Sequence, residues 1–465
     1  MQRNDQFAAS RPSNNETIVA ISTPPGRGGI GIVRLSGPRS LPIALGLVRL
    51  RHPLVHAHAR FAEVLDPERP HESERIDDAL VTWFAAPNSY TGEDLVEIAA
   101  HGSPIVLDLL VRQSLLRGAR LGEPGEFTQR AFLSGRIDLT QAEAVRDLID
   151  AQTLYQARLA AQQMGGALSR RIHPIKLRLV EMIATLEAGI DFAEDDVDVI
   201  SNPELLARIS EAEQALATIA ATFAQGRIVH SGLTLAIVGR PNAGKSSLFN
   251  RIAERERAIV TASPGTTRDL VTERVSIGGI PVELVDTAGL REARDEAESI
   301  GIQKTREAFS EADIVLLVLD ATQERNAEET DLLAAISSRP ALVALNKSDL
   351  VPEKTIPAEL SSLTVVRTSA LTGAGIDELR KQVLAKAGAT GEPQSGLLTN
   401  LRQHQAVTAA VEALSAAASA VANRTPHEML LIDLYQALRQ LDALTGETTP
   451  DDILNLIFST FCIGK

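Results

Sequence analysis

The feature that most constrains the fold is a glycine-rich segment, GRPNAGKS, at residues 239–246. It follows the apolar run LTLAIV and opens the segment SSLFNRI, whose apolar residues have helical spacing. This strand–loop–helix order is the context of a phosphate-binding loop, because the glycines let backbone N–H groups face phosphate and the helix N-terminus adds a favourable dipole. The pattern predicts that Lys245 contacts the β- and γ-phosphates and that Ser246 binds Mg²⁺.

Three further motifs follow in the order typical of a nucleotide-hydrolysing α/β domain. GTTRD lies at residues 265–269, DTAG at 286–289 after an apolar run, and NKSD at 346–349. We expect Asp286 to hold Mg²⁺ through a water and the Gly289 N–H to sense the γ-phosphate. One of the two threonines of GTTRD, with Thr267 favoured, would complete the Mg²⁺ shell.

Asp349 of NKSD indicates the base, because a carboxylate only accepts hydrogen bonds and guanine offers two donors at N1 and N2. A backbone N–H at Ser369–Ala370 can reach guanine O6. The order of these elements predicts GTP rather than ATP. The predicted nucleotide contacts are Asn242, Ala243, Gly244, Lys245, Ser246, Ser247, Thr261, Ala262, Ser263, Pro264, Gly265, Thr266, Thr267, Asp286, Thr287, Ala288, Gly289, Asn346, Lys347, Asp349, Ser369 and Ala370.

The position after DTAG departs from Ras-type enzymes, which place a water-orienting glutamine there. This chain has Leu290, which cannot hydrogen-bond a water. Asn242, inside the phosphate-binding loop, carries a spare side-chain acceptor. Another group must therefore orient the nucleophile and supply charge.

Length and charge set the remaining bounds. A chain of 465 residues is too long for one core and suggests about three domains. The single cysteine, Cys462, rules out an internal disulfide and fits a reducing, cytoplasmic compartment. We see no apolar run of membrane-spanning length, and residues 1–16 resemble a disordered tail rather than a secretory signal. The net charge of −14 argues against a broad nucleic-acid-binding face, so any RNA contact is local or shared with a partner.

The pattern of residues changes three times along the chain. Residues 17–133 mix β-rich runs with Gly/Pro punctuation, and residues 134–230 are helical, with helix-start signals at Thr140–Glu143 and Asn202. Residues 231–390 alternate strands and helices, and 391–465 are helical again. We therefore expect a multidomain α/β and α protein. It has an N-terminal α+β domain, one discontinuous helical domain, and an inserted P-loop α/β domain with a mostly parallel sheet.

The chain resembles the MnmE (TrmE) family of tRNA-modification GTPases along nearly its whole length. The specific blocks are TIVAISTPPGRGGIGIVRLSG, NSYTGEDLVEIAAHG, GEPGEFTQRAFLSGRIDLTQAEAVRDLI and the terminal FCIGK. The resemblance implies a folate-binding, dimerising N-terminal domain (17–133), a helical domain (134–230 and 391–465) and a G domain (231–390). It also implies a homodimer that works with an MnmG-type FAD protein as a heterotetramer.

The activity that the resemblance implies is modification of C5 of the wobble uridine in certain tRNAs. An aminomethyl-type group (carboxymethylaminomethyl) is added, and its one-carbon unit comes from a tetrahydrofolate derivative, 5-formyl- or 5,10-methylene-tetrahydrofolate. GTP hydrolysis would drive a conformational change. Two other functions remain open: a ribosome-assembly GTPase switch with a related G domain, and a folate-binding protein similar to aminomethyltransferases.

The same resemblance assigns further residues. The folate site would include Arg34, Glu97, Arg136 and Lys465, although a lone arginine is usually a solvated surface charge. A K⁺ site would use Asn242, Thr261, Ser263 and Thr266, in place of an arginine finger. Glu298 would orient the water, although it also fits a solvent-facing position in an acidic helix.

Several features fit the family less simply. His101-Gly102-Ser103 stands where the family often has His-Gly-Gly, and the N-terminal tail is longer than the family needs. The glycines at 26, 28 and 31 match a dinucleotide fingerprint but precede a β-rich run, so we interpret them as a turn. Cys462 could be a reactive thiol, and it equally fits a buried small hydrophobe.

Overall fold

The chain folds into two compact units in a computed structural model. The structure describes residues 16–66, 75–191, 200–253, 271–286, 312–351, 360–361, 363–388, 396–447 and 464. The first unit comprises residues 1–146 and 445–465, and the second comprises residues 147–444.

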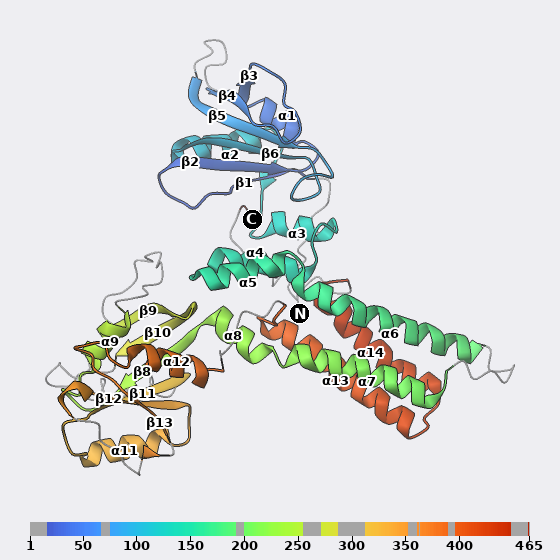
Figure 1. Ribbon diagram of the computed structural model, residues 1–465. Helices are drawn as coiled ribbons and strands as arrows, with labels where there is room; N and C mark the ends of the chain where they lie inside the picture. The colour runs from blue at the N-terminus through green and yellow to red at the C-terminus, as the bar shows by residue number, and fades with distance from the viewer. Residues whose placement is uncertain are drawn as a thin grey trace, which may run out of the picture. The chain divides into compact units, whose positions relative to one another are not determined.

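The first unit is built on a seven-stranded sheet. Its strands are β1 (Ile18–Ile21), β2 (Gly28–Ser36), β3 (Val48–Leu50), β4 (Arg60–Leu65), β5 (Arg75–Phe84), β6 (Leu95–Gly102) and β7 (Arg120–Leu121). They are ordered β3-β4-β5-β6-β2-β1-β7 (Figure 1). Neighbours are antiparallel except β1 and β7, which are parallel. The helices are α1 (Ser40–Leu45), α2 (Pro104–Leu116), α3 (Glu126–Leu133) and most of α4 (Leu139–Asp150).

Helix α2 covers the centre of this sheet. Its Leu107 and Leu110 share a buried core with Val33 of β2 and Ile98 of β6. A Cβ at Gly31 would overlap the Leu107 side chain, so this glycine permits the close approach of helix and strand. The fingerprint-like glycines therefore lead into and form part of a strand that pairs antiparallel with β6, not a loop opening a helix. The prediction of a turn was therefore wrong for Gly28 and Gly31, which lie inside β2, and only Gly26 lies in a bend before the strand.

A buried charge network joins α3 to the sheet edge. Glu126 and Arg130 are 1% and 3% exposed and are paired at 2.9 Å. Arg120 also binds Glu126, at 2.6 Å, and Arg130 reaches Glu93 at 2.9 Å. Burial alone would raise the pKa of Glu126, but hydrogen bonds from Arg120, the Glu123 N–H and Arg130 outweigh it, so this pKa lies below its ordinary value.

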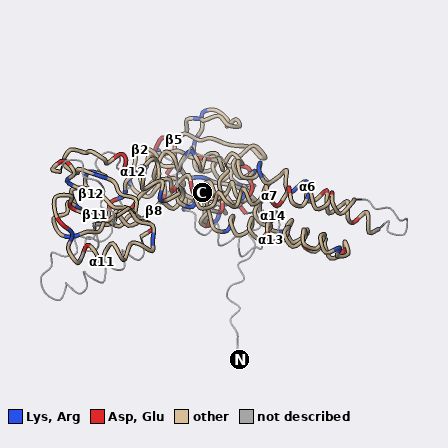
Figure 2. The backbone as a smooth tube through the Cα atoms, turned by 60° about the horizontal axis from the view of Figure 1, so that its bottom comes forward, with Lys and Arg blue, Asp and Glu red and all other residues tan. Residues whose placement is uncertain are grey.

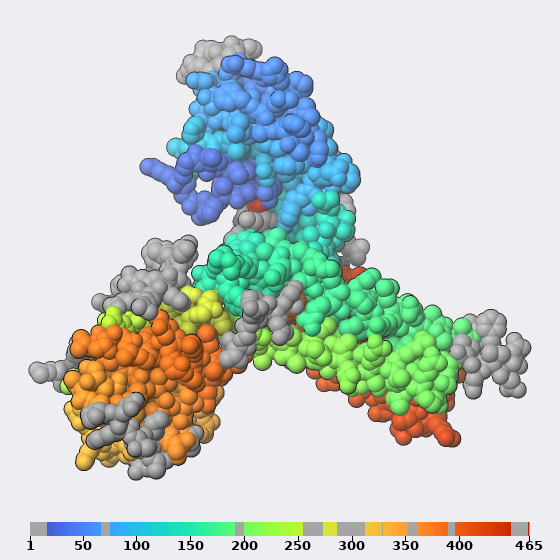
Figure 3. Space-filling view, viewed as in Figure 1, coloured from blue at the N-terminus to red at the C-terminus, as the bar shows by residue number. Residues whose placement is uncertain are grey.

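The second unit contains a helical bundle made from two separate stretches of chain. Its long helices are α6 (Ala167–Asp191), α7 (Asn202–Ala220), α13 (Leu401–Ala422) and α14 (His427–Thr445), which share one apolar core. Figure 3 shows green α6 and α7 packed beside the red C-terminal helices. The shorter α5 (Leu154–Met164) precedes α6. The prediction of a discontinuous helical domain with the α/β domain inserted is confirmed.

Helix α13 has the composition of a membrane span. Among the described residues it is the one helix long and apolar enough, with a mean hydropathy of 1.3. The prediction that no apolar run has membrane-spanning length was therefore wrong by length and composition. Its Val407, Ala410, Leu414 and Ala417 lie in the shared core of the bundle. One face of α13 therefore packs inside the bundle.

The α/β domain is inserted in the sequence between the two halves of the bundle. Its strands are β8 (Leu233–Val238), β9 (Val271–Ile277), β10 (Ile280–Asp286), β11 (Ile314–Asp320), β12 (Ala341–Asn346) and β13 (Thr364–Arg367). The order is β13-β12-β11-β8-β10-β9, and only the edge strand β9 is antiparallel to its neighbour. Apolar cores form on both faces of the sheet. The helices are α8 (Phe223–Ser231), α9 (Lys245–Ala253), α11 (Ala327–Ile336) and α12 (Ile376–Lys386).

Two helix starts differ from the sequence analysis. The side chain and N–H of Asp138 exchange hydrogen bonds with Gln141, both at 3.0 Å, so the capping box lies two residues before Thr140–Glu143. Ser201, not Asn202, caps α7. Both predictions of the starting residue were wrong, although the helices exist.

Charges are mixed along the described chain. Figure 2 shows Lys and Arg segments interspersed with Asp and Glu segments in both units. This distribution agrees with the net charge of −14 and gives no single basic stripe among the described residues.

Candidate nucleotide-binding site

The phosphate-binding loop joins β8 to α9 and adopts a backbone that most residues avoid. Gly239 and Gly244 have φ of +148° and +92°, and Asn242 has φ of +63°. A Cβ at Gly239 would overlap the carbonyl oxygen of Val318, and one at Gly244 would overlap the amide of Asn346. Glycine is therefore required at positions 239 and 244, because a side chain there would strain the backbone and would collide with a neighbouring residue.

Lys245 is held inside this loop. Its Nζ donates hydrogen bonds to the carbonyl oxygens of Gly239 and Arg240, both at 2.8 Å, and the residue is buried. The ammonium is thus kept at the centre of the loop, where the phosphates of a nucleotide would meet it. Ser246 and Ser247 are exposed at the start of α9, and Asn242 is exposed at the loop tip. Both serines therefore lie at the solvent-exposed start of the helix that follows the loop.

Asn346 ties the phosphate-binding loop to the base-binding loops. Its Nδ2 donates to the Ala243 carbonyl oxygen at 3.0 Å, and its Oδ1 accepts from the Ala370 N–H at 3.1 Å. Asn346 is 2% exposed. One buried side chain thereby fixes the spacing of three predicted nucleotide-binding segments.

The rest of NKSD presents Asp349 to solvent. Lys347 has φ of +60°, and its Nζ binds Asp320 at the end of β11 at 2.7 Å. Burial alone would raise the pKa of Asp320, but hydrogen bonds from Lys347 and Thr322 outweigh it and hold that pKa below its usual value. The pair anchors the turn, and Asp349 lies exposed in the following 3₁₀ turn, Ser348–Leu350. Its carboxylate is accessible to a purine edge.

Asp286 completes the described part of the site. It ends β10 and pairs in parallel with Ile237 of β8, two residues before Gly239. The strand register therefore brings the start of DTAG beside the phosphate-binding loop. The other predicted residues of these motifs lie outside the described residues: Thr261, Ala262, Ser263, Pro264, Gly265, Thr266, Thr267, Thr287, Ala288, Gly289, Leu290 and Glu298.

One contact of the loop escaped the sequence analysis. Arg240 Nε lies 3.1 Å from Glu329 Oε1 on α11, with side-chain exposures of 13% and 2%. Glu329 also belongs to the capping box of α11, where its side chain accepts from the Asn326 N–H. A helix-start signal was present in NAEE at residues 326–329, but nothing in the sequence linked it to Arg240.

The first unit gathers part of the predicted folate site. Arg34 of β2 donates from Nε and Nη2 to Glu97 Oε1 of β6 at 2.9 and 2.7 Å. Its Nη1 donates to the Gly464 carbonyl oxygen at 3.3 Å, and Ser22 donates to the same oxygen at 2.9 Å. Arg34 therefore contacts both Glu97, sixty-three positions later in the chain, and Gly464 of the FCIGK segment.

Aromatic rings flank this arginine. The Arg34 guanidinium lies 5.9 Å from the ring centre of Tyr90 and 5.6 Å from that of Phe127. Burial raises the pKa of the Tyr90 hydroxyl, which hydrogen-bonds Thr128. Arg136 is exposed after α3, beside the Gly92 backbone. Lys465 and Cys462 lie outside the described residues.

Comparison with known proteins agrees with this architecture. Residues 17–136 match the family described as the GTP-binding protein TrmE N-terminus, and residues 139–462 match the MnmE helical domain. The tRNA modification GTPase MnmE of Koribacter versatilis is 60% identical over 456 residues, covering 97% of this chain and 99% of that protein. The MnmE of Aquifex aeolicus is 40% identical over 451 residues, covering 97% of this chain and 100% of that protein.

A solved structure was also found for the inserted domain. The G domain of the T. maritima FeoB iron transporter shares 28% identity, covering 33% of this chain and 98% of that chain, with a TM-score of 0.26. The identification rests on the full-length relatives and the two family matches. The chain belongs to the MnmE family of tRNA modification GTPases, and its G domain is that of a GTP hydrolase.

Proposed function

We propose that this GTPase acts with an MnmG-type FAD protein to add a carboxymethylaminomethyl-type group to C5 of the wobble uridine of certain tRNAs. The one-carbon donor is a tetrahydrofolate derivative, and the working form is a homodimer within a heterotetramer in the cytoplasm. The observation that supports folate most directly is the meeting of Arg34, Glu97 and the C-terminal Gly464. A folate offers carboxylates that suit an arginine and a pterin whose N–H donors suit a carboxylate.

Arg34 and Glu97 form an ion pair across β2 and β6. A bound folate would share these groups, with Tyr90 and Phe127 as apolar walls. Arg136 and Lys465 would add positive charge. The part of the chain at 17–133 would be the folate-binding domain, 231–390 the G domain, and 134–230 with 391–465 the helical domain.

The test measures the modified wobble uridine in a strain lacking its own copy of the gene, complemented with the full chain. We expect Glu97→Gln to lose modification and tetrahydrofolate binding while GTP binding stays within about twofold. The control variant is Asp349→Asn, which should lose GTP binding and keep tetrahydrofolate binding. Normal modification by Glu97→Gln would refute the assignment of the folate site. If the wobble uridine stays unmodified although the full-length chain and its partner are both present, the protein would instead be a ribosome-assembly switch or have an aminomethyltransferase-like role.

We also propose how hydrolysis proceeds with Leu290 after DTAG. Charge develops between the β- and γ-phosphates in the transition state, and Lys245 and Mg²⁺ are already present in slow GTPases. When bound, K⁺ would supply the positive charge that an arginine finger supplies elsewhere. The exposed amide of Asn242, with oxygens of Thr261, Ser263 and Thr266, would hold that ion.

Two other groups complete this proposal. Ser246, with Thr267, would bind Mg²⁺. Glu298 would orient the water that Leu290 cannot. Steady-state hydrolysis in matched KCl and NaCl tests the scheme, since Na⁺ is too small for the same oxygen cage. We expect fast turnover in KCl only, and loss of that stimulation in Asn242→Ala. Equal rates in the two salts would contradict it.

A further inference from the structure

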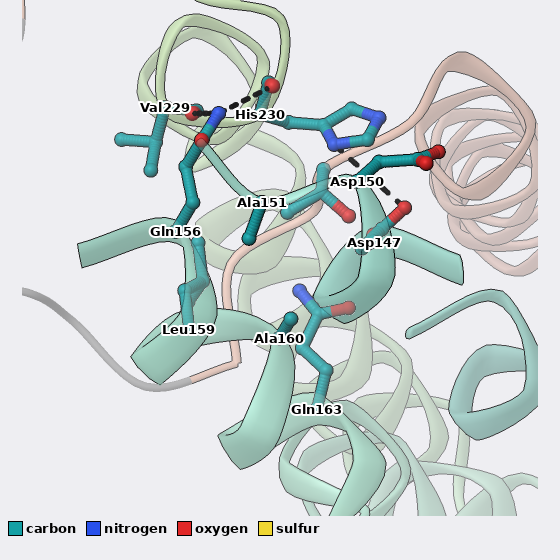
Figure 4. Close-up of a pocket in the computed structure, with 10 residues that line it drawn as sticks. Asp147, Asp150, Ala151, Gln156, Leu159, Ala160, Gln163, Val229 and His230 are labelled. Carbon is teal, nitrogen blue, oxygen red and sulfur yellow. Dashed lines mark hydrogen bonds and ion pairs between the residues drawn. The ribbon is translucent and has the colours of Figure 1, made fainter. Parts of the chain in front are cut away.

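A small cavity lies in the second unit, and none of its lining residues was assigned to the nucleotide or the folate. Its volume is about 50 Å³, which is room for roughly three or four water-sized groups. It opens where the end of α4, α5, α8 and the segment before α13 meet (Figure 4). The lining residues are Asp147, Asp150, Ala151, Gln156, Leu159, Ala160, Gln163, Val229, His230 and Thr399.

Two buried side chains in this cavity each have one polar atom without a hydrogen-bond partner. Gln163 is 1% exposed, and its Nε2 donates to the Leu397 carbonyl oxygen at 2.8 Å. That bond fixes the orientation of the amide, so Oε1 is the atom left without a hydrogen bond. Thr399 is 4% exposed, and its Oγ1 is likewise without a partner. Buried unpaired polar atoms are rare, so two of them on one cavity indicate a polar occupant.

The remaining lining determines which polar groups fit. Asp147 and Asp150 contribute carboxylates, and His230 Nδ1 lies 3.7 Å from Asp147 Oδ1. Both glutamine amide groups on the wall already donate to backbone: Gln156 Nε2 donates to the Val229 and His230 carbonyl oxygens, at 2.9 Å each, and Gln163 Nε2 donates to that of Leu397. Figure 4 shows the Gln163 amide on the same side of the cavity as the two aspartates. An occupant must therefore donate hydrogen bonds, and positive charge favours it.

The other walls are apolar. Leu159 and Val229, with two alanines, face the same space and would exclude water from a short hydrocarbon chain. Among the described residues no cluster of His, Cys, Asp and Glu has the arrangement to hold a metal ion. A ligand that carries a carboxylate would be repelled by Asp147 and Asp150. These constraints leave a small organic cation with one ammonium end and one hydrocarbon end.

We propose that this cavity is a binding site for a short primary alkylammonium ion of about three or four heavy atoms. The ammonium group donates to Gln163 Oε1 and Thr399 Oγ1, in the field of Asp147 and Asp150. The alkyl chain lies against Leu159 and Val229.

The site lies at the junction of the helical bundle with the G domain. Its walls include α8, where the chain leaves the bundle, and Thr399, where it returns. Thr153, the N-cap of α5, donates from Oγ1 to the Gly279 carbonyl oxygen, in the turn between β9 and β10, at 2.6 Å. A bound amine therefore contacts both connections and the helix that holds this turn, and it stabilises their arrangement.

The test is calorimetric titration of the full chain with propylammonium chloride, at constant ionic strength set with KCl. Matched titrations use 1-propanol, which keeps the chain but lacks the charge, and glycine, which adds a carboxylate. We expect saturable binding to one site for propylammonium, and at least tenfold weaker binding for the other two. Thr399→Val keeps the side-chain volume and should weaken propylammonium binding about tenfold, as loss of a charge-assisted hydrogen bond does.

The control variant is Thr218→Val, on an exposed part of α7, where the hydroxyl binds the Gln214 carbonyl oxygen. It should bind the amine like the unchanged chain. Because Thr399 Oγ1 has no partner in the protein, Thr399→Val should fold normally, and Asp150→Asn gives a second, charge-only variant. Equal affinity in both threonine variants, equal binding of propanol, or a crystal structure with propylammonium that shows only waters in the cavity would each overturn the proposal.

Discussion

The pair Arg240–Glu329 links the phosphate-binding loop to α11, and its removal gives a quantitative prediction. Taking away one member of a buried pair costs about 3–5 kcal/mol, because the other charge stays uncompensated. Arg240 is 13% exposed, so water relieves part of this cost. We expect Arg240→Met and Glu329→Met each to lose about 2–4 kcal/mol from the stability of the G domain. The double variant leaves no charge behind, so it should be less stable than the unchanged chain by only about 1 kcal/mol, the cost of losing the Glu329 cap on the Asn326 N–H.

The assay is thermal unfolding of the full chain with and without GDP. The transition that GDP raises belongs to the G domain, because a ligand stabilises only the fold that binds it. Each single variant should lower that transition by roughly 5–15 °C, at about 2–4 °C for each kcal/mol in a domain of this size. The double variant should recover most of the loss. Single effects that simply add in the double variant would refute the coupling.

Three further predictions follow from the described contacts. Asn346→Asp should weaken the binding of GTP and of GDP by about 30-fold or more, because a buried carboxylate would face the Ala243 carbonyl oxygen. A fluorescent-nucleotide titration measures both affinities, and the control variant Ser348→Ala should leave them unchanged. Asp349→Asn should lose GTP and gain xanthosine triphosphate, and unchanged GTP affinity would contradict the base assignment. The pKa of Glu126 is lowered in the fold, so its contribution is complete above its ordinary pKa of 4.5 and is lost as the pH falls below that value; Glu126→Gln should flatten the acid side of the stability profile, and an unaltered profile would argue against it.

The sequence was most informative where a backbone conformation or a chemical group leaves little choice. Gly239 and Gly244 stand where a side chain would collide with Val318 and Asn346, so the loop could be predicted from its pattern. The parallel strands could be predicted because both faces of the sheet are covered, which makes them continuously apolar. The antiparallel edge strand β9, VTERVSI, has three consecutive polar residues in place of a continuous apolar run and was not predicted.

Contacts between distant segments could not be predicted without the resemblance. Arg34, Glu97 and Gly464 meet because β2 pairs with β6 in one register, which no local pattern specifies. The start of α4 was misplaced for a local reason. Asp138 and Thr140 are both good caps, and the Asp138 carboxylate accepts from the Thr140 hydroxyl as well as from the Gln141 N–H. Two adjacent signals therefore competed, and the structure uses the earlier one.

The two crossings between the bundle and the G domain have a consequence for how such a protein can be assembled by recombination. Leu398 lies in the segment that returns to the bundle, and its N–H donates to Thr222 Oγ1, in the segment that leaves it, at 3.1 Å. The Leu398 carbonyl oxygen also passes so close to Gly226 that a side chain there would overlap it. The segment that leaves the bundle and the segment that returns to it therefore contact each other. A whole GTPase could be inserted or excised there in one genetic event, and a single short bridge from the end of α7 to the start of α13 would keep the surrounding helices in register.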